Sequence, residues 1–188
     1  MSLEEFNVQA PYSGIVTVIV ICFIAFGAIL VALGVFNKVR YFGYSLLSSK
    51  YTCVIGGIVL ILTALGLSFV YYSPSTITVG NGYINVQFAA FSTIPPIGEK
   101  NITSSQISSA FVSQIGSGVF DLNKQNGINN GDTNVGVFTL GNGATAYVAS
   151  TNSTDLIIEL KNGQYVILGT SNTDGLATSF AQHVFALK

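Results

Sequence analysis

Two long runs of apolar residues dominate the first third of the chain. The first extends from Ile15 to Phe36, and as a helix it would be about 33 Å long, enough to cross the hydrocarbon core of a bilayer. The second extends from Cys53 to Val70 and is flanked on both sides by tyrosines, which favour the headgroup region. The pattern therefore predicts two transmembrane helices, at about 15–36 and 51–72.

The connector between the two runs, residues 37–50, carries basic side chains and no acidic one. Its three basic residues, Lys38, Arg40 and Lys50, are expected to anchor it on the cytoplasmic side. We therefore expect a multi-pass hairpin in the cell membrane, with the N-terminus and everything after residue 72 outside. A cleavable signal peptide is the alternative for the first run, but the leader is acidic and the run is longer than a signal h-region.

Small side chains recur along both runs and would allow the two helices to approach closely. Helix packing is expected to use Ala25, Ala28 and Ala32 on the first helix, and Gly57, Ala64 and Gly66 on the second. The alternative is that small residues are merely tolerated in membrane spans. Neither run contains Asp, Glu, Lys, Arg or His, which proton relays and ion pathways use. The hairpin is therefore expected to be an anchor and a packing surface.

The pattern changes after Ser73-Pro74, where short alternating segments replace the long apolar runs. Asn-Gly pairs at 81–82, 142–143 and 162–163 separate runs rich in β-branched residues, as two-residue hairpin turns require. A hairpin domain over 1–74 and a mainly-β domain over 75–188, built from meandering strands in a sandwich or small barrel, are expected. The predicted strands are Thr76–Val79, Tyr83–Ala90, Ser109–Ile115, Val119–Asp121, Val135–Leu140, Ala144–Ala149, Leu156–Leu160 and Gln164–Leu168.

Two polar stretches and one amphipathic segment complete the pattern. Residues 93–106 and 123–134 are dense in turn-forming residues and are predicted to be loops. A C-terminal helix is predicted at about 174–187, because capping residues precede it and Asp174 favours its first turn. Its apolar stripe consists of Leu176, Phe180, Val184 and Leu187.

This order of elements accompanies a sequence resemblance. The resemblance lies mainly in two segments, Gly136-Val-Phe-Thr-Leu-Gly-Asn-Gly-Ala-Thr-Ala-Tyr-Val-Ala-Ser and Asp155-Leu-Ile-Ile-Glu-Leu-Lys-Asn-Gly-Gln-Tyr-Val-Ile-Leu-Gly, followed by Thr173-Asp174 and the final helix. Gly82-Tyr-Ile-Asn-Val and Ile107-Ser-Ser-Ala-Phe-Val also contribute. Together these segments resemble bacterial and archaeal pleckstrin-homology-like (PH-like) domains over most of residues 76–188. The resemblance implies a barrel whose open end the helix fills, and it implies no single activity.

The composition restricts the partners. Only 8% of the 188 residues are charged, whereas soluble domains carry about a quarter. The formal net charge of -1 provides no basic field for nucleic acid. We therefore expect the lipid bilayer and integral membrane protein subunits as partners. A surface of Ser, Thr and Asn keeps its charge state in acid, which favours an archaeal or acid-exposed envelope protein.

Few side chains are suited to catalysis or to holding a cofactor. His183 is the only histidine and is expected at a helix boundary, because no carboxylate or thiolate is close to it in sequence. Cys22 and Cys53 lie at different depths in their spans and are not expected to form a disulfide. Asp155 and Glu159 share one face of a predicted strand, and we expect both to face solvent there. The alternative is that the two carboxyls act together as a general acid–base pair. We expect no enzyme activity, no cofactor and no metal.

Two sequons, Asn101-Ile-Thr and Asn152-Ser-Thr, lie in the region expected outside the membrane. They predict a glycoprotein with glycans on Asn101 and Asn152, although a chain so rich in Asn, Ser and Thr also produces sequons by chance.

These patterns together predict a non-catalytic, membrane-anchored interaction module, an accessory or assembly subunit of a larger membrane complex. The alternative is a self-associating structural envelope or virion membrane protein, which would form a homo-oligomer. A channel built from several hairpins is a third class, but Thr17, Thr63 and Ser68 are few polar groups to line a pore.

Overall fold

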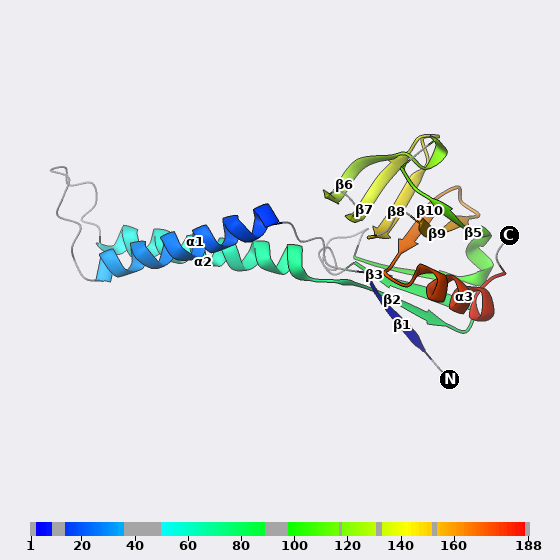
Figure 1. Ribbon diagram of the computed structural model, residues 1–188, viewed down its shortest axis with the longest axis horizontal. Coiled ribbons are helices and arrows are strands. Elements are labelled where there is room, and N and C mark those ends of the chain that lie inside the picture. Colours follow the sequence, from blue (N-terminus) through cyan, green and yellow to red (C-terminus); the bar gives the residue numbers. More distant parts are fainter. Residues whose placement is uncertain are drawn as a thin grey trace. The chain divides into compact units, whose positions relative to one another are not determined.

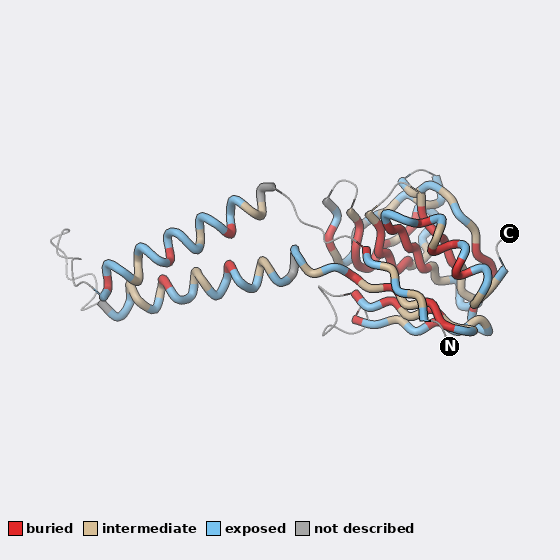
Figure 2. The backbone as a smooth tube through the Cα atoms, turned by 60° about the horizontal axis from the view of Figure 1, so that its bottom comes forward, coloured by how far each residue is buried: buried red, intermediate tan, exposed pale blue. Residues whose placement is uncertain are grey.

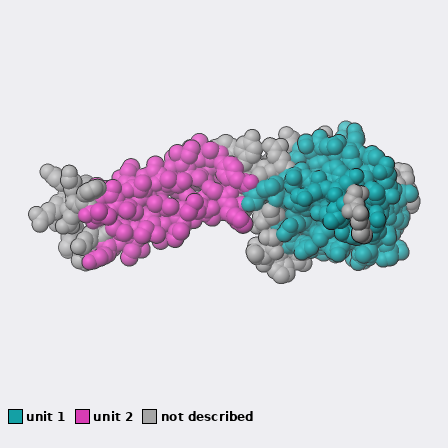
Figure 3. All heavy atoms as spheres, turned by 90° about the horizontal axis from the view of Figure 1, so that it is seen from below, with its two compact units in different colours: residues 1–11, 73–188 teal, residues 12–72 magenta. Residues whose placement is uncertain are grey.

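The chain divides into two compact units (Figures 1 and 3). The computed structural model describes residues 3–8, 14–35, 50–88, 98–116, 118–130, 133–151 and 154–186. Residues 12–72 form a helical unit, and residues 1–11 together with 73–188 form a β unit. The structure thus differs from the expected boundary at residue 74, because the residues before the first helix belong to the β unit.

The helical unit contains α1 (Gly14–Val35) and α2 (Lys50–Tyr72). Both bounds lie within one residue of the predicted spans. Val16–Val35 and Tyr51–Phe69 are long and apolar enough to cross a membrane. Most of their residues are exposed, as the pale blue tube of Figure 2 shows. They include large apolar residues such as Phe26 and Phe69. An apolar surface of this extent is unfavourable in water and is suited to lipid or to other apolar helices.

The helical hairpin is inserted between two neighbouring strands of one sheet. β1 (Glu4–Val8) precedes α1 and pairs antiparallel with β2 (Ser75–Gly80), which follows α2. Phe6 lies opposite Ile77, and Val8, which is fully buried, lies opposite Ser75. Cleavage after the first apolar run would remove β1 from its sheet, which argues against the signal-peptide alternative.

The first sheet has the strand order β1-β2-β3-β4 and is antiparallel throughout. β3 (Tyr83–Gln87) follows the Asn-Gly turn at 81–82, where Gly82 has a φ of 79°. β4 (Glu99–Thr103) falls within residues 93–106, so the prediction of a loop there is wrong. Its sequence, EKNIT, has a single apolar position, and pairing with β3 at this edge makes it a strand.

The second sheet has six strands in the order β5-β9-β10-β8-β7-β6. Every neighbouring pair is antiparallel except β8 and β10, which are parallel. β10 therefore lies between β8 and β9, and the expected simple meander is wrong at this point. The strands are β5 (Ile107–Gln114), β6 (Leu122–Asn130), β7 (Thr133–Leu140), β8 (Thr145–Ser150), β9 (Thr154–Leu160) and β10 (Tyr165–Gly169).

Two short segments near β6 differ from the predictions. The stretch 123–134, predicted to be a loop, is mostly β6, an edge strand that pairs with β7. Its polar side chains suit an edge, and an irregularity in register between Lys124 and Asn126 interrupts the pairing there. Val119–Asp121, predicted to be a strand, instead overlaps a 3-10 turn at Gly118–Phe120.

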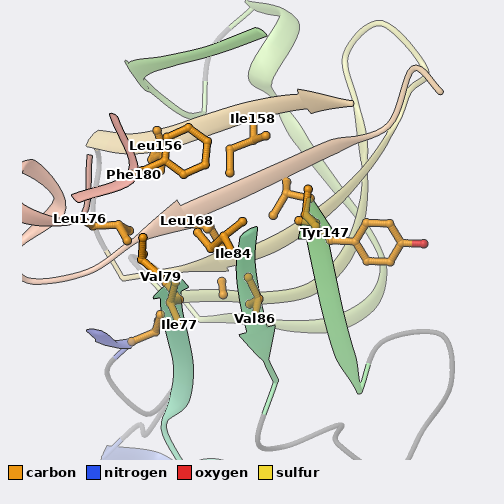
Figure 4. Packing of buried hydrophobic residues seen from close by; sticks show 14 of the residues in the cluster. Ile77, Val79, Ile84, Val86, Tyr147, Leu156, Ile158, Leu168, Leu176 and Phe180 are labelled. Atoms are coloured by element: carbon orange, nitrogen blue, oxygen red, sulfur yellow. The ribbon is translucent and has the colours of Figure 1, made fainter. Parts of the chain in front are cut away.

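The main core of the β unit lies between the two sheets and α3 (Thr173–His183), as Figure 4 shows. Ile77 and Val79 from the first sheet pack with Leu168 from the second, and Leu176 and Phe180 from α3 belong to the same buried cluster. The Oδ1 atom of Asn172 accepts a hydrogen bond from the Gly175 amide and caps α3. The predicted C-terminal helix is confirmed, although it ends at His183.

A second apolar cluster lies on the opposite face of the six-stranded sheet. It consists of Phe138, Leu140, Ala146, Val148, Ile157 and Ile167, and Phe111, Phe120 and Tyr165 are among the partly buried residues that pack against it. Both faces of this sheet are therefore apolar, as in a sheet covered on both sides. The structure shows a mainly-β region with a C-terminal helix and no closed barrel among the described residues. Membership of the PH-like family stays a prediction.

Candidate functional site

The contact between α1 and α2 is formed by a row of small and medium residues. Val20, Gly27 and Gly34 are buried on α1, and Gly57 and Ala64 are buried on α2. All are spaced by seven residues along their helices, the repeat of a coiled-coil seam. The hydroxyl groups of Thr17 and Tyr72 are hydrogen-bonded across the pair at 2.5 Å.

The structure places only part of the predicted packing set in this contact. Gly57 and Ala64 lie in it, whereas Ala25, Ala28 and Ala32 are exposed on α1. Gly66 is exposed on α2. The packing face of α1 is offset from the alanine stripe, because Gly27, and not an alanine, is buried against Gly57 of α2. The three alanines instead form a stripe of small, exposed residues on α1.

The remaining predicted residues on the connector and at the sequons are only partly described. Lys38 and Arg40 lie outside the described residues, and Lys50 is the first residue of α2. Asn101 is exposed on the edge strand β4 rather than in a loop. Asn152 lies outside the described residues.

The chemically most unusual group is Asp155, the second residue of β9. Its side chain is completely buried, so the expectation that it faces solvent is wrong. Asp155 is on the same face of β9 as Ile157, a member of the second apolar cluster. Its Oδ1 atom accepts a hydrogen bond of 2.7 Å from the Ser150 hydroxyl on β8.

This hydrogen bond passes over an intervening strand. β10 lies between β8 and β9, and Gly169 on β10 is paired with Ser150. A Cβ atom on Gly169 would collide with Asp155 Oδ1 and would lie 2.7 Å from Ser150 Oγ. The absence of a side chain at Gly169 is therefore what allows the carboxyl and the hydroxyl to meet.

Asn134 on β7 extends the same line of polar residues. It pairs with Ser150 and shares its face of β7 with Phe138, a member of the second apolar cluster. Asn134 is 8% exposed, and Asp155 and Ser150 are fully buried. We name Asn134, Ser150, Gly169 and Asp155 the Asp155 row; it lies across four adjacent strands, β7, β8, β10 and β9.

Burial determines the electrostatics of this row. Desolvation raises the pKa of Asp155 from 3.8 to about 6, and the hydrogen bond from Ser150 opposes this effect. No neighbouring charge contributes to the shift among the described groups. A carboxyl of this kind exchanges a proton near pH 6, whereas an ordinary aspartate does so near pH 4.

Glu159, the other half of the predicted acid pair, occupies a different environment on the same strand. Its Oε2 atom accepts a hydrogen bond of 2.7 Å from the Ser109 hydroxyl on β5. Burial raises the pKa of the nearby Tyr165 hydroxyl, and the negative charge of Glu159 raises it further. The two carboxyls thus have separate hydrogen-bond partners, which does not favour a joint acid–base role.

Other candidate positions offer little chemistry. No group of three or more His, Cys, Asp or Glu side chains among the described residues could hold a metal ion. A surface groove of about 250 Å³ is lined by Ser105, Gln106, Leu160, Lys161 and Asn162, with one cationic side chain. His183 ends α3, and its carbonyl oxygen accepts a hydrogen bond from the Gly82 amide at 2.7 Å.

The Asp155 row was missed in the sequence for a physical reason. In the sequence, a single Asp at the start of a strand is typical of a strand end that is exposed to solvent. Its burial depends on the order in which the strands pair, which the local sequence does not indicate. One signal was present, since Ser150 and Gly169 each end an apolar strand with a residue small enough to leave space.

No known protein family, curated protein or solved structure matches this chain.

Proposed function

We propose that this protein is a non-catalytic, membrane-anchored interaction module that serves as an accessory or assembly subunit of a membrane complex. The observation that carries the proposal is the pairing of β1 with β2 on either side of the helical hairpin. Two strands that pair directly must lie on one side of any membrane that the intervening hairpin crosses. Two spans, rather than one, satisfy this requirement.

The charge distribution supports the orientation of the hairpin. Lys38, Arg40 and Lys50 are in the connector, which favours the cytoplasm. The β unit is then outside the cell membrane, with both chain termini, and Asn101 and Asn152 become available for glycosylation. We propose the PH-like resemblance as the family of this domain, on the basis of strands followed by one C-terminal helix.

The outer face of the hairpin supports a role in assembly. Ala25, Ala28 and Ala32 form an exposed stripe of small residues on the side of α1 that α2 does not cover. Small residues allow a third helix to approach closely, since association within lipid depends on backbone proximity and packing. The partner we propose is therefore a transmembrane helix of another subunit.

The orientation can be tested by labelling engineered cysteines in a chain in which Cys22 and Cys53 are replaced by alanine. Asn101→Cys on β4 should react with a membrane-impermeant maleimide on intact cells. Ser48→Cys in the connector should react only after the cells are permeabilised. The reverse pattern would overturn the proposed orientation.

The assembly role can be tested by purification of the tagged full chain in mild detergent. We expect a second membrane protein in a fixed ratio, and we expect Ala28→Leu to weaken its recovery. Ile29→Leu is the matched control, because Ile29 is also exposed on α1 but is already large. A monomer without partners would contradict the proposal, and a homo-oligomer alone would favour the self-associating structural protein.

A further inference from the structure

The Asp155 row contains two buried oxygen atoms that accept no hydrogen bond. These are Oδ2 of Asp155 and Oδ1 of Asn134, on either side of Ser150 along the row. Buried polar atoms are nearly always paired, and an unpaired buried acceptor destabilises the fold. Both orphaned atoms are acceptors, so the row has an excess of buried acceptors over donors.

The described side chains that lie opposite or beside Asp155 provide no cation to neutralise it. β5 contributes Ser113 opposite Asp155, β10 contributes Gly169, and β8 contributes Ser150. The titratable groups with described side chains on this face of the sheet are Glu159 and Tyr165, towards the other end of their strands. Neither can neutralise an ionised carboxylate at neutral pH. Lys124 on β6 is paired with Phe138 and so occupies a position on the same face, at the far edge of the sheet.

We propose that Asp155 is a proton-binding site built into the β unit, and that the proton removes a buried charge that no described side chain of this row neutralises. When protonated, Oδ2 becomes a hydrogen-bond donor, while Oδ1 still accepts from Ser150. The protonated form thus keeps the side-chain link between β8 and β9 without a buried charge. The ionised form leaves a buried charge with one oxygen unpaired.

The direction of the pH effect follows from the two protonation states. Burial holds the pKa of Asp155 at about 6 in the folded chain, against 3.8 for a carboxyl in water. Between these values the folded chain binds the proton and the unfolded chain does not, so stability falls as pH rises from 4 to 6. The folding equilibrium constant should fall about tenfold per pH unit, up to about 100-fold, and stay low above pH 6. The β unit is therefore most stable in mild acid.

Three substitutions at Asp155 and a control separate this proposal from a structural role. Urea unfolding of the full chain in detergent, followed by circular dichroism between pH 4 and 8, is the measurement. Asp155→Asn keeps an acceptor for Ser150 and adds a permanent donor, so it should lose the pH dependence and exceed the wild type at pH 7 by up to about 100-fold. Asp155→Ala and Asp155→Leu lack both polar functions and report on packing alone.

The control is Asp121→Asn, because Asp121 is exposed and its loss should leave the wild-type pH profile unchanged. The infrared carbonyl band of a protonated carboxylic acid should be stronger at pH 5 in the wild type than in Asp155→Asn, by the share that Asp155 contributes. The proposal is overturned if Asp155→Asn is less stable than the wild type at pH 7, since the fold would then depend on the ionised carboxylate. It is equally overturned if Asp155→Asn retains the wild-type slope.

Discussion

Gly27 and Gly57 face each other across the helical hairpin with no room for a side chain on either. A Cβ atom on Gly27 would lie 2.8 Å from the Gly57 carbonyl oxygen, and one on Gly57 would lie 2.5 Å from the Gly27 carbonyl oxygen. Real Cβ atoms do not approach oxygen this closely, so any larger residue must separate the helices. The hairpin therefore depends on two glycines at one level.

Gly57→Leu should destabilise the hairpin by about 1–3 kcal/mol, the usual range for overpacking. Gly66→Leu on the same helix is the control, because Gly66 is exposed and a Cβ atom added to it would have no neighbour within 4 Å. The thermal midpoint of the full chain in detergent is the measurement. Equal losses from both substitutions would show that the contact at Gly57 has no special role.

Gly169→Ala should destabilise the β unit, because the new methyl group would occupy the position of Asp155 Oδ1. We expect a loss of about 1–3 kcal/mol from the resulting overpacking. The same substitution should cost much less in an Asp155→Ala background, where the carboxyl is gone. A double-mutant cycle from urea unfolding measures this coupling, and additive effects would rule out the proposed contact.

Phe120→Ala should weaken the cover of the second apolar cluster. The Phe120 ring lies 5.8 Å from the Phe111 ring centroid and 6.1 Å from that of Tyr165. Since Phe120 is only half-buried, we expect a loss of about 1–2 kcal/mol, below the range for fully buried rings. Val119→Ala, at a neighbouring residue that is 50% exposed, should change the urea midpoint little.

Val8→Asp should detach β1 from the first sheet. Val8 is fully buried, so a carboxylate there would lie in the core without a partner, at a cost of about 3 kcal/mol or more. Asn7→Asp is the matched control, because Asn7 is exposed and its Oδ1 atom already serves as an acceptor for the Thr76 hydroxyl. Limited proteolysis should remove an N-terminal epitope from Val8→Asp first. Equal resistance of the two variants would argue against a stable β1.

The sequence predicted elements that local pattern determines. Uninterrupted apolar runs identified both long helices, and Asn-Gly pairs identified the turns at 82, 143 and 163, where the glycines have φ near 80°. The C-terminal helix followed from its cap and its apolar stripe. In each case the signal and the structure lie within the same few residues.

The elements that were missed depend on distant partners. β1 and β4 have few apolar residues and are strands because β2 and β3 offer them hydrogen-bonding edges. The burial of Asp155 requires β10 to insert beside β8, and nothing within β9 indicates this. The offset between the alanine stripe and the helix contact likewise depends on which face of α1 meets Gly57.

If the hairpin crosses a membrane as we propose, its insertion between β1 and β2 also links folding to membrane insertion. β1 is synthesised first, but its partner appears only after both helices have left the ribosome. A chain with only one helix across the bilayer would place β1 and β2 on opposite sides, with Val8 and Ile77 unable to share a core. In the proposed arrangement, therefore, the first sheet can close only when both helices have crossed the bilayer.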